Sequence, residues 1–380
     1  MVLTLFFTRG VSLELWLNRG LFDREKLIYE EHLKQGNLKK VYWITYGSND
    51  LKLSNQLKKD KRLNPNIVVV GMPKLFNLPK IGSYLYSLLI PFLYPKIFRH
   101  TDIFKSNQMD GAWSGVIAKK LYNVPFINRT GYTLSLFCKR KNKPKLKQLI
   151  IEKIESIIFD MADVSFVSSS QDKHYLNGKY NFNKSTLSVF RNYIDVGLFH
   201  PLNTKRNNKI VFVGRLDKQK NLFNLIESIS NTDLELDVYG QGELEQELIK
   251  FTKSINAKIK FQGVADNKKL PDILNQYKYY ILSSYYEGMP KTLLEAMACG
   301  CICIGTDVPG INEIIRDGDN GILAKNLTSE SISKALKRAI NTDNKEVLIK
   351  NGVSMVNERY ALKVIAQKEF LIFRELVNDR

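Results

Sequence analysis

The sequence lacks an apolar run long enough to span a bilayer. Its longest apolar stretches, MVLTLFF at the start and YLYSLLIPFLY at residues 84–94, are far shorter than the roughly 20 residues that a transmembrane helix needs. The first stretch has no basic residues before it and runs into Arg9 and Gly10, so it predicts a buried first strand and not a signal peptide. We therefore expect no membrane-spanning segment.

Cysteine is scarce, with four residues in 380. Cys299, Cys301 and Cys303 alternate along a predicted strand, a spacing that matches neither a zinc knuckle nor a CxxC pair. Neighbouring positions of this kind cannot easily bridge one another, so the spacing does not favour disulfides. The pattern predicts reduced, buried thiols in a cytosolic protein.

Acidic residues are few in the first half of the chain. Residues 1–200 hold 31 Lys and Arg against 15 Asp and Glu, whereas residues 201–380 hold 26 against 23, and the overall formal charge is +19. A basic half suits a polyanionic partner, either nucleic acid or anionic lipid. A lysine-rich surface that only keeps the protein soluble is the plain alternative.

Short apolar strands alternate with amphipathic helices along both halves. Strands are predicted at residues 2–7, 41–46, 66–71, 102–107, 124–130 and 163–169, and again at 209–216, 234–240, 259–264, 278–284 and 301–306. Such strands are typical of parallel sheets covered on both faces. The pattern restarts after the polar stretch 201–209, so we expect an α/β protein with two doubly wound domains. Ligands of these sheets bind beyond the carboxyl ends of the strands, and the cleft between two facing domains is the expected site.

The stretch VFVGRLDKQKN (211–221) follows that rule for phosphate ligands. A predicted strand ends at Gly214, whose missing Cβ lets a ligand approach the backbone, and Arg215 and Lys220 flank the loop before a helix. Two cations and a helix N-terminus after a strand form a phosphate site on physical grounds. The loop is neither a GxxxxGK[ST] nor a GxGxxG pattern. Taken alone, such a loop is weak evidence for phosphate binding and is more often a surface turn.

A second acidic and apolar stretch, EGMPKTLLEAMACG (287–300), follows another predicted strand. Pro290 favours the first turn of a helix and Gly300 its end. The free amides at that helix start would face an anion, with the Glu287 carboxylate before it and the Glu295 carboxylate inside the helix. Carboxylates accept hydroxyl groups well, so the arrangement suits a phosphorylated sugar, although two glutamates near a helix are usually a solvated face.

These stretches together resemble the GT-B glycosyltransferases of family 4 (group 1). The two glutamates stand within EGMPKTLLEAMACGCICIGTDVPGINEII (287–315), and GRLDKQKN (214–221) is similar to the family's diphosphate loop. FRNYIDVGLFHP (190–201) is similar to its inter-domain passage, and the likeness runs from about residue 100 to the end. The resemblance implies a retaining, hexosyltransferase-type enzyme that uses a nucleoside-diphosphate sugar, UDP- or GDP-linked, with no cofactor and no metal. It also implies an acceptor-binding domain at 1–200, a donor-binding domain at 201–360, and a C-terminal helix of about 361–380 that packs back onto the first domain.

The resemblance assigns roles to particular residues. Arg215, Lys220 and Glu287 would be catalytic: the two cations would neutralise the diphosphate leaving group, and Glu287 would hold hydroxyls of the donor sugar. Glu295 would hold the ribose hydroxyls. The full set expected to bind the donor is Gly214, Arg215, Lys220, Gly263, Val264, Glu287, Gly288, Met289, Pro290, Lys291, Thr292 and Glu295. Retention in this family is explained by same-face attack, so neither glutamate needs to be a nucleophile.

The first half departs from the family pattern. A histidine common after the strand of VPFINRTGYTLS (124–135) is missing, and Arg129 and Thr130 stand there instead. Arg129 either faces an anion or forms a structural ion pair. Gly10 corresponds to a glycine-containing loop of the family and lacks the second glycine often seen there. These three residues are the expected acceptor-side positions.

Two further segments resemble functional motifs. Asp317-Gly-Asp319 looks like a metal-binding DxD, but its Gly-rich surroundings predict a surface turn. The segment 138–161 begins with basic residues, which can lie on anionic lipid, and continues into an apolar stripe that we expect to face the core. Its cations are Lys139, Arg140, Lys141, Lys143, Lys145, Lys147 and Lys153, and its stripe is Leu149, Ile150, Ile154, Ile157 and Ile158.

The acceptor expected from this pattern is a lipid-linked or surface glycan of a bacterial polysaccharide such as capsule, O-antigen or exopolysaccharide. The enzyme would then be cytoplasmic and peripheral on the inner face of the plasma membrane. A nucleotide-sugar epimerase on the same scaffold is the alternative, but its histidine near the sugar has no counterpart here. Nucleic-acid binding is less favoured, because the basic half lacks a helix-turn-helix pattern, zinc ligands or aromatic-interleaved sheet motifs.

Overall fold

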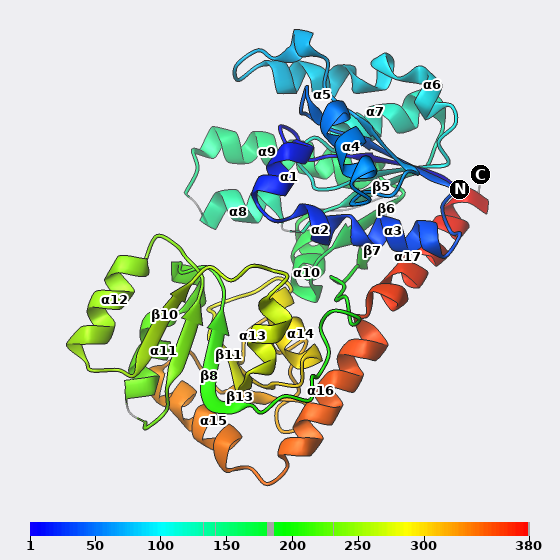
Figure 1. Cartoon of the computed structure of the whole chain (residues 1–380). Helices are drawn as coiled ribbons and strands as arrows, with labels where there is room; N and C mark the ends of the chain where they lie inside the picture. The colour runs from blue at the N-terminus through cyan, green and yellow to red at the C-terminus, as the bar shows by residue number, and fades with distance from the viewer. Residues whose placement is uncertain (132, 141, 181–185, 231, 379–380) are drawn as a thin grey trace. The chain divides into compact units, whose positions relative to one another are not determined.

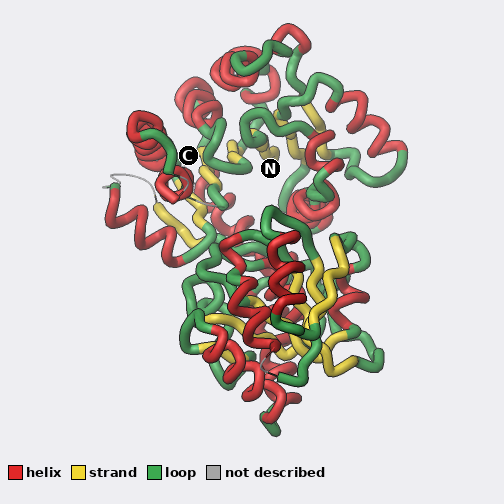
Figure 2. Tube along the Cα trace, turned by 90° about the vertical axis from the view of Figure 1, so that its left-hand side faces the viewer, coloured by secondary structure: helices red, strands yellow, loops and turns green. Residues whose placement is uncertain are grey.

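The computed structural model describes residues 1–131, 133–140, 142–180, 186–230 and 232–378. The chain divides into two compact units: unit 1 comprises Met1–Arg191 and Ala366–Arg380, and unit 2 comprises Asn192–Ile365. Each unit is built on its own parallel sheet, with helices on either side of the strands (Figure 1, Figure 2). This confirms the predicted α/β class with two doubly wound domains.

Unit 1 contains a seven-stranded parallel sheet in the order β3-β2-β1-β4-β5-β6-β7. Its strands are β1 (Val2–Phe6), β2 (Lys40–Ile44), β3 (Ile67–Val70), β4 (Ile103–Ser106), β5 (Phe126–Arg129), β6 (Val164–Val167) and β7 (Thr186–Val189). The six strands predicted in this half are all present. The seventh, β7, was missed because it is an edge strand whose sequence TLSV has no continuous apolar run.

Unit 2 contains a six-stranded parallel sheet in the order β10-β9-β8-β11-β12-β13. Its strands are β8 (Asn207–Val213), β9 (Leu236–Tyr239), β10 (Ile259–Gly263), β11 (Tyr277–Leu282), β12 (Ile302–Thr306) and β13 (Ile322–Ala324). In both sheets the strand order reverses beside the first strand, between β1 and β4 and between β8 and β11. Such a reversal is the topological switch point where doubly wound folds bind ligands.

Helices connect the strands in both units. In unit 1 they are α1 (Leu13–Asn18), α2 (Phe22–Glu25), α3 (Leu27–Lys34), α4 (Asp50–Lys59), η1 (Lys74–Phe76), α5 (Gly82–Leu93), α6 (Pro95–Phe98), α7 (Trp113–Tyr122), α8 (Leu134–Arg140), α9 (Lys145–Met161) and α10 (Ser170–Lys179). In unit 2 they are η2 (Lys218–Lys220), α11 (Leu222–Ser230), α12 (Glu245–Ser254), α13 (Leu270–Asn275), α14 (Lys291–Ala298), α15 (Ser329–Asn341) and α16 (Lys345–Arg359), and α17 (Leu362–Asn378) leads back into unit 1. Within the described ranges, no helix is long and apolar enough to cross a membrane.

The basic segment of unit 1 differs from its prediction in one respect. The buried residues of α9, Glu155, Ile158 and Phe159, all lie in its second half. Leu149, Ile150 and Ile157 are exposed, so the prediction that the whole stripe faces the core was wrong. The cations at 143, 145, 147 and 153 are exposed as expected. Lys141 and the side chain of Arg140 lie outside the described residues.

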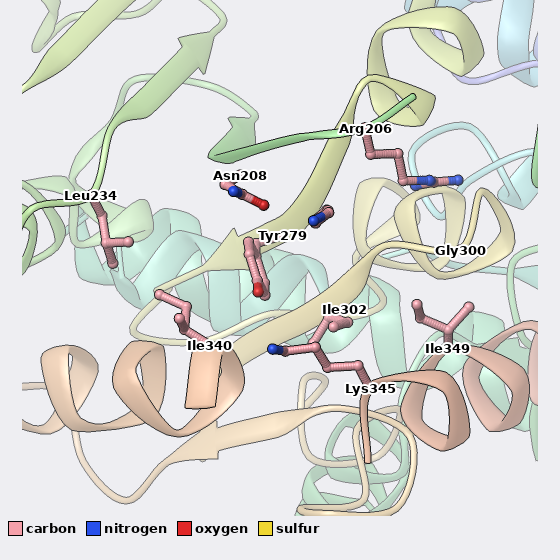
Figure 3. A pocket seen from close by; sticks show the side chains of 10 residues that line it. Arg206, Asn208, Leu234, Tyr279, Gly300, Ile302, Ile340, Lys345 and Ile349 are labelled. Carbon is pink, nitrogen blue, oxygen red and sulfur yellow. The ribbon is translucent and has the colours of Figure 1, made fainter. Parts of the chain in front are cut away.

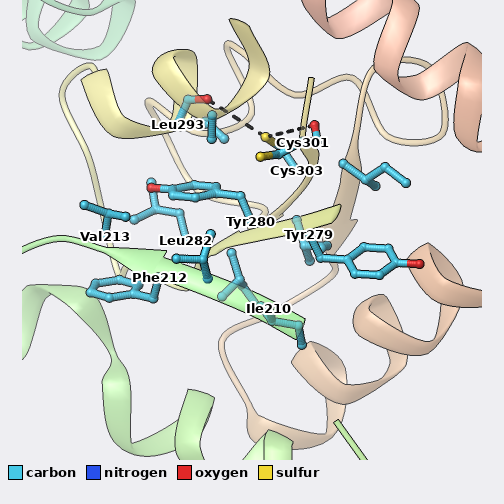
Figure 4. Packing of buried hydrophobic residues seen from close by; sticks show 14 of the residues in the cluster. Ile210, Phe212, Val213, Tyr279, Tyr280, Leu282, Leu293, Cys301 and Cys303 are labelled. Atoms are coloured by element: carbon cyan, nitrogen blue, oxygen red, sulfur yellow. Dashed lines mark hydrogen bonds between the residues drawn. The ribbon is translucent and has the colours of Figure 1, made fainter. Parts of the chain in front are cut away.

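The core of unit 2 is formed by its sheet and the helices that pack on it, among them α11, α14 and α15, and it contains three of the four cysteines. Cys303 is fully buried beside Leu293, and its thiol donates to the backbone oxygens of Leu293 and Cys301 (Figure 4). All four cysteines of the chain are free and buried. Burial raises the pKa of the Cys301 thiol to about 12, and it also raises the pKa values of Cys299 and Cys303.

We expect these thiols to be unreactive in the folded protein, because only the thiolate attacks disulfide reagents. An aromatic disulfide reagent at pH 8 should modify almost no cysteine in native protein and all four after unfolding in guanidinium. Rapid modification of one or more thiols without denaturant, at the rate of free cysteine, would contradict the buried placement.

A buried ionic cluster fastens α17 to the rest of unit 1. The carboxylate of Glu369 on α17 contacts the ammonium of Lys105 on β4, and its other oxygen lies 2.9 Å from Nε2 of His32 on α3. All three side chains are almost inaccessible to solvent. Burial alone raises the pKa of the Glu369 carboxyl, but Lys105 and His32 together lower it to about 2. The carboxylate is therefore ionised in the folded state at neutral pH.

Replacing Glu369 should destabilise unit 1, because it leaves the Lys105 charge buried without a counter-charge. For Glu369→Gln we expect the free energy of unfolding to fall by about 3 to 5 kcal/mol, measured by urea denaturation. The double variant Lys105→Met/Glu369→Leu, which removes both charges, should recover most of that loss. The contribution of the Glu369 carboxylate to the free energy of unfolding should be complete above about pH 4.3, the pKa of this residue in the unfolded chain. It should disappear as the pH falls towards 2, the pKa in the folded protein. If the free energy of unfolding of Glu369→Gln lies within about 1 kcal/mol of that of the natural protein, the cluster does not stabilise the attachment of α17.

Candidate functional site

The candidate site lies at the carboxyl-terminal edge of the unit 2 sheet. The loop with Gly214 follows β8, and the loop with Glu287 follows β11, the strand that pairs with β8 in parallel. Because parallel neighbours end at the same edge, the topology brings these two loops together at the switch point. The sequence placed them 73 positions apart in separate motifs.

Lys220 and Glu287 are in direct contact. The Lys220 Nζ lies 2.6 Å from Oε1 of Glu287, and Ser284 Oγ donates to the same oxygen at 2.5 Å. Gln219 Nε2 lies 3.4 Å from the other carboxylate oxygen. Glu287 is buried and the Lys220 ammonium largely so, which means that solvent screens this ion pair less than a surface pair. The predicted phosphate-binding cation and the predicted sugar-binding carboxylate thus form one cluster.

Backbone contacts hold the two loops in register. Tyr285 N donates to Gln219 O at 2.9 Å, and Ser283 Oγ donates to Lys220 O at 2.8 Å. Lys220 is the last residue of η2, and the following Asn221 adopts a left-handed conformation at φ 54°. The loop after β11 therefore helps to position the Lys220 side chain, together with the loop after β8 that carries this residue.

Arg215 is placed differently from Lys220. Its side chain is 76% exposed, and its guanidinium lies 3.4 Å from Asp217. An exposed pair at this distance is weak, so the side chain can leave Asp217 at little cost. The structure does not bring Arg215 into the Lys220–Glu287 cluster.

Helix α14 begins directly after the Glu287 loop. Pro290 is the N-cap residue in extended conformation, and Lys291, Thr292 and Leu293 are the first helical positions, whose amides have no acceptor inside an α-helix. The Thr292 hydroxyl accepts a hydrogen bond from buried Tyr280 at 2.8 Å. Glu295 lies on the second turn and is almost completely buried.

The residues around Gly288 and Met289 are packed by two other segments. Asn192 Nδ2 donates to Met289 O at 3.3 Å, and the Lys291 ammonium lies 4.7 Å from the centre of the Tyr193 ring. Gly310, at φ 83°, approaches so closely that a Cβ there would lie 2.4 Å from Glu287 O. This close approach fixes the backbone that carries Glu287.

Backbone hydrogen bonds connect Gly263 to the carboxyl-terminal edge of the unit 2 sheet that carries the site. Gly214 N donates to Tyr239 O at 3.0 Å, and Gly240 N donates to Gly263 O at 2.8 Å. Gly263 has a φ of 74° and open space beside its Cα, and Val264 is mostly exposed. Gly263 and Val264, which the sequence predicted to bind the donor, therefore lie on an accessible main-chain turn two strands from Gly214.

Four residues of this edge were not among the predicted site residues: Gln219, Gly240, Ser284 and Gly310. A Cβ at Gly240 would lie 1.8 Å from Gly214 O, so only glycine permits the observed contact between the β8 and β9 loops. The sequence YGQG (239–242), directly after a predicted strand, was an available indication of such a loop. Ser284 and Gln219 gave none, because their contact with Glu287 depends on the pairing of β8 with β11.

The predicted acceptor-side residues lie at the carboxyl edge of the unit 1 sheet. Gly10 follows β1 with a φ of 75°, and Arg129 ends β5, so β4 lies between their strands. Arg129 N donates a hydrogen bond to Ser106 Oγ at 2.9 Å. Thr130 is buried, and its amide donates to Phe166 O. The structure thus places these residues on separate loops of one edge.

The DGD stretch forms a structural turn. The Nη2 atom of Arg338 lies 3.1 and 3.0 Å from the two carboxylate oxygens of Asp317, and Leu323 N donates to one of them. Gly318 N donates to Gly321 O, which closes the turn. Among the residues that the structure describes, no group of three or more His, Cys, Asp or Glu side chains is placed to hold a metal ion.

A pocket of about 420 Å³ lies at the opposite edge of the unit 2 sheet (Figure 3). It is lined by residues at the beginnings of strands, such as Asn208, Tyr279 and Ile302, and by Lys345 at the start of α16. None of the predicted donor residues lines it. Ligands of parallel sheets bind at the carboxyl ends of strands, so we assign this pocket no part in the candidate site.

Known proteins that resemble this chain in sequence or in fold are glycosyltransferases. The family "Glycosyl transferases group 1" matches residues 199–354. An uncharacterized glycosyltransferase of Methanocaldococcus jannaschii is 29% identical over 252 residues, which cover 62% of this chain and 64% of that protein. A UDP-Gal:alpha-D-GlcNAc-diphosphoundecaprenol alpha-1,3-galactosyltransferase of Escherichia coli is 26% identical and covers 70% of this chain and 72% of its own length. The solved structure of Anabaena HepE in complex with UDP and glucose superposes with a TM-score of 0.74 at 15% identity, over 99% of this chain and all of that one.

The two doubly wound parallel-sheet units have the GT-B glycosyltransferase fold. Residues 199–354, which carry the candidate site, match the family of group 1 glycosyl transferases. These findings confirm the resemblance seen in the sequence. The match spans less than two thirds of the length of the M. jannaschii relative.

Replacing Gly240 tests whether the glycine contact builds this edge. In Gly240→Ala the new Cβ would collide with Gly214 O, so we expect a loss of at least about 3 kcal/mol in stability and loss of nucleoside-diphosphate binding. The matched control is Gly318→Ala, which has a φ of 78° but open space; it should lose about 1 to 2 kcal/mol and keep binding. Thermal unfolding and titration calorimetry with UDP measure both effects. Unchanged UDP binding in Gly240→Ala would contradict this construction of the edge.

Proposed function

We propose that this chain is a retaining glycosyltransferase that moves a hexosyl group from a nucleoside-diphosphate sugar to a lipid-linked or surface-glycan acceptor. The observation that carries the proposal is the cluster of Lys220, Glu287 and Ser284 beside the start of α14, at the switch point of the unit 2 sheet. A cation, a buried carboxylate and the amides of a helix N-terminus are the groups that a diphosphate linked to a sugar requires.

The Lys220–Glu287 pair supplies a way to bind the donor without leaving a buried charge alone. A diphosphate that approaches α14 takes the Lys220 ammonium as its counter-charge. Glu287 is thereby released from Lys220 and accepts hydroxyls of the sugar, while Ser284 continues to donate to it. Arg215, exposed on the same loop, swings to the outer phosphate, and Glu295 accepts from the ribose hydroxyls.

The reaction then needs no nucleophile from the protein. The bond between the anomeric carbon and the phosphate oxygen breaks as the acceptor hydroxyl forms its bond on the same face. The acceptor proton passes to the departing phosphate, so atoms and charge balance. Lys220, Arg215 and the α14 amides stabilise the developing diphosphate.

UDP is the first donor nucleotide to test, since UDP is bound in the HepE structure and UDP-Gal stands in the name of the E. coli relative. That relative's name also contains a diphosphoundecaprenol acceptor, which favours a lipid-linked acceptor and a cytoplasmic enzyme peripheral to the inner membrane face. The exposed cations of segment 138–153 favour the same placement.

Activity and three variants test this proposal. Release of UDP from UDP-sugars should require a membrane extract that contains acceptor; isomerisation of the donor without acceptor would instead indicate an epimerase. Lys220→Met and Glu287→Gln should each lower kcat/KM by about 10²- to 10³-fold. Lys334→Met, which removes an exposed cation of α15, is the matched control and should leave activity unchanged.

Glu295→Ala addresses ribose binding separately. The natural protein should bind UDP about 10- to 100-fold more tightly than 2′,3′-dideoxy-UDP, the range expected when hydrogen bonds to a charged carboxylate are lost. Glu295→Ala should bind the two nucleotides with equal affinity. Retained discrimination in this variant would show that Glu295 does not hold the ribose.

A further inference from the structure

Helix α5 of unit 1 exposes a continuous apolar surface. Its sequence, GSYLYSLLIPFL, contains no charged residue. Six large side chains along it are between 39% and 58% exposed: Tyr84, Leu85, Leu88, Leu89, Phe92 and Leu93. Leu75, Leu78 and Ile81, which precede the helix, are more than half exposed. We call these nine residues the apolar ridge.

The apolar ridge is not needed by the core of unit 1. The inner face of α5 consists of other residues, Tyr86, Ser87, Ile90 and Pro91, and they are buried. Helix α7 is bonded to this inner face: Trp113 Nε1 donates to Ser87 Oγ at 2.9 Å. The ridge residues recur at helical spacing on the opposite, outer face of α5. Surface helices of globular proteins usually carry polar residues on that face. An apolar face of this extent marks an interaction site.

The turn before α5 is fixed rather than loose. Gly82 lies so close to Phe76 that a Cβ there would be 1.9 Å from the Phe76 carbonyl oxygen. The Phe76 ring packs 5.4 Å from the Tyr86 ring, which ties η1 to the inner face. The ridge is therefore presented by a packed element.

The surroundings of the ridge are basic. No Asp or Glu occurs between residues 61 and 101, whereas Lys74, Lys80, Lys96 and Arg99 flank the ridge and are exposed. A second acid-free stretch, residues 111–151, leads into α9, whose Leu149 and Ile150 are also exposed. Helix α7 packs against both α5 and α9, so these surfaces belong to one layer of unit 1.

We propose that the apolar ridge inserts into the interface of an anionic lipid bilayer, with α5 lying in the membrane plane. A helix of 12 residues is about 18 Å long, too short to span a bilayer but sufficient to lie in its interface. Anionic lipid offers apolar chains to the ridge and negative headgroups to its flanking cations. A second copy of the chain fits less well, because an isologous contact would bring the same cations together without acids to neutralise them.

The ridge is also linked to the predicted acceptor edge. The Arg9 guanidinium stacks 3.7 Å from the centre of the Tyr84 ring and is bonded to Asp110 at 2.9 Å. Arg9 directly precedes Gly10. Insertion of Tyr84 would therefore hold the Gly10 loop near the lipid headgroups, where a lipid-linked acceptor presents its sugar. This last consequence rests on the proposed function, whereas membrane insertion does not.

Vesicle partitioning of the full chain tests the ridge. Sedimentation with sucrose-loaded vesicles of phosphatidylcholine containing 30% phosphatidylglycerol should show binding that persists in part at 0.5 M NaCl, because the apolar contribution is not screened. Leu88→Gln/Phe92→Gln should lower the partition coefficient at least about tenfold and make the remaining binding fully salt-sensitive. Val347→Gln/Leu371→Gln, which alters two comparably exposed apolar residues outside the ridge, is the matched control and should bind like the natural protein.

A fluorescent label reports insertion directly. The four native cysteines are buried, so Leu88→Cys can be labelled selectively with an environment-sensitive dye. Its emission should shift to the blue on addition of anionic vesicles, and a label at Val347→Cys should not shift. Equal partitioning of Leu88→Gln/Phe92→Gln and natural protein, complete release by salt, or a ridge-dependent dimer that binds no vesicles would each overturn the proposal.

Donor binding separates this inference from the proposed function. Leu88→Gln/Phe92→Gln should retain the natural affinity for UDP, since its substitutions lie in unit 1 on an exposed helix face. UDP binding without ridge-dependent partitioning would refute the membrane inference alone. Ridge-dependent partitioning without UDP binding would refute the proposed function alone.

Discussion

The parallel pairing of β8 with β11 is the constraint on which the candidate site depends. It places the end of one strand beside the end of the other, and with them the Lys220 and Glu287 side chains, which come from different loops. Close backbone contacts at Gly240 and Gly310 then fix each loop against its neighbour. A site of this kind is built by backbone geometry first and by charged side chains second, so its accuracy depends on these glycines as well as on Lys220 and Glu287.

The ion pair within the site has a physical consequence for binding. A buried carboxylate or a buried ammonium alone is costly, whereas the Lys220–Glu287 pair with its Ser284 donor satisfies both charges before any ligand arrives. An anionic, hydroxyl-rich ligand can replace both halves of the pair at once. A ligand with only one of these features leaves one charge without a partner, which favours a sugar joined to a diphosphate over either group alone.

The two units of the chain differ in their surfaces. The acid-poor half of the sequence forms unit 1, which also carries the apolar ridge and the exposed apolar side chains of α9. The C-terminal helix is anchored to this unit by the fully buried Lys105–Glu369–His32 cluster. Unit 2, in contrast, has nearly balanced charge and holds the residues matched by the glycosyl transferase family. The division of charge therefore follows the division of the fold.

The sequence by itself determined the α/β class, eleven strands and the two loops of the candidate site, because apolar periodicity, Gly and Pro positions and short charged motifs are local properties. Only the tertiary structure decided that Lys220 contacts Glu287 while Arg215 faces solvent, that Gly240 and Gly310 support the loops, and that β7 and β13 close the sheet edges. It also decided which apolar faces stay exposed: α5 and the first half of α9 have core-like sequences, yet their outward sides find no partner within the described chain. A side chain is buried only where the fold places other residues against it. The spacing of leucines along a helix does not determine which face of that helix other elements will cover.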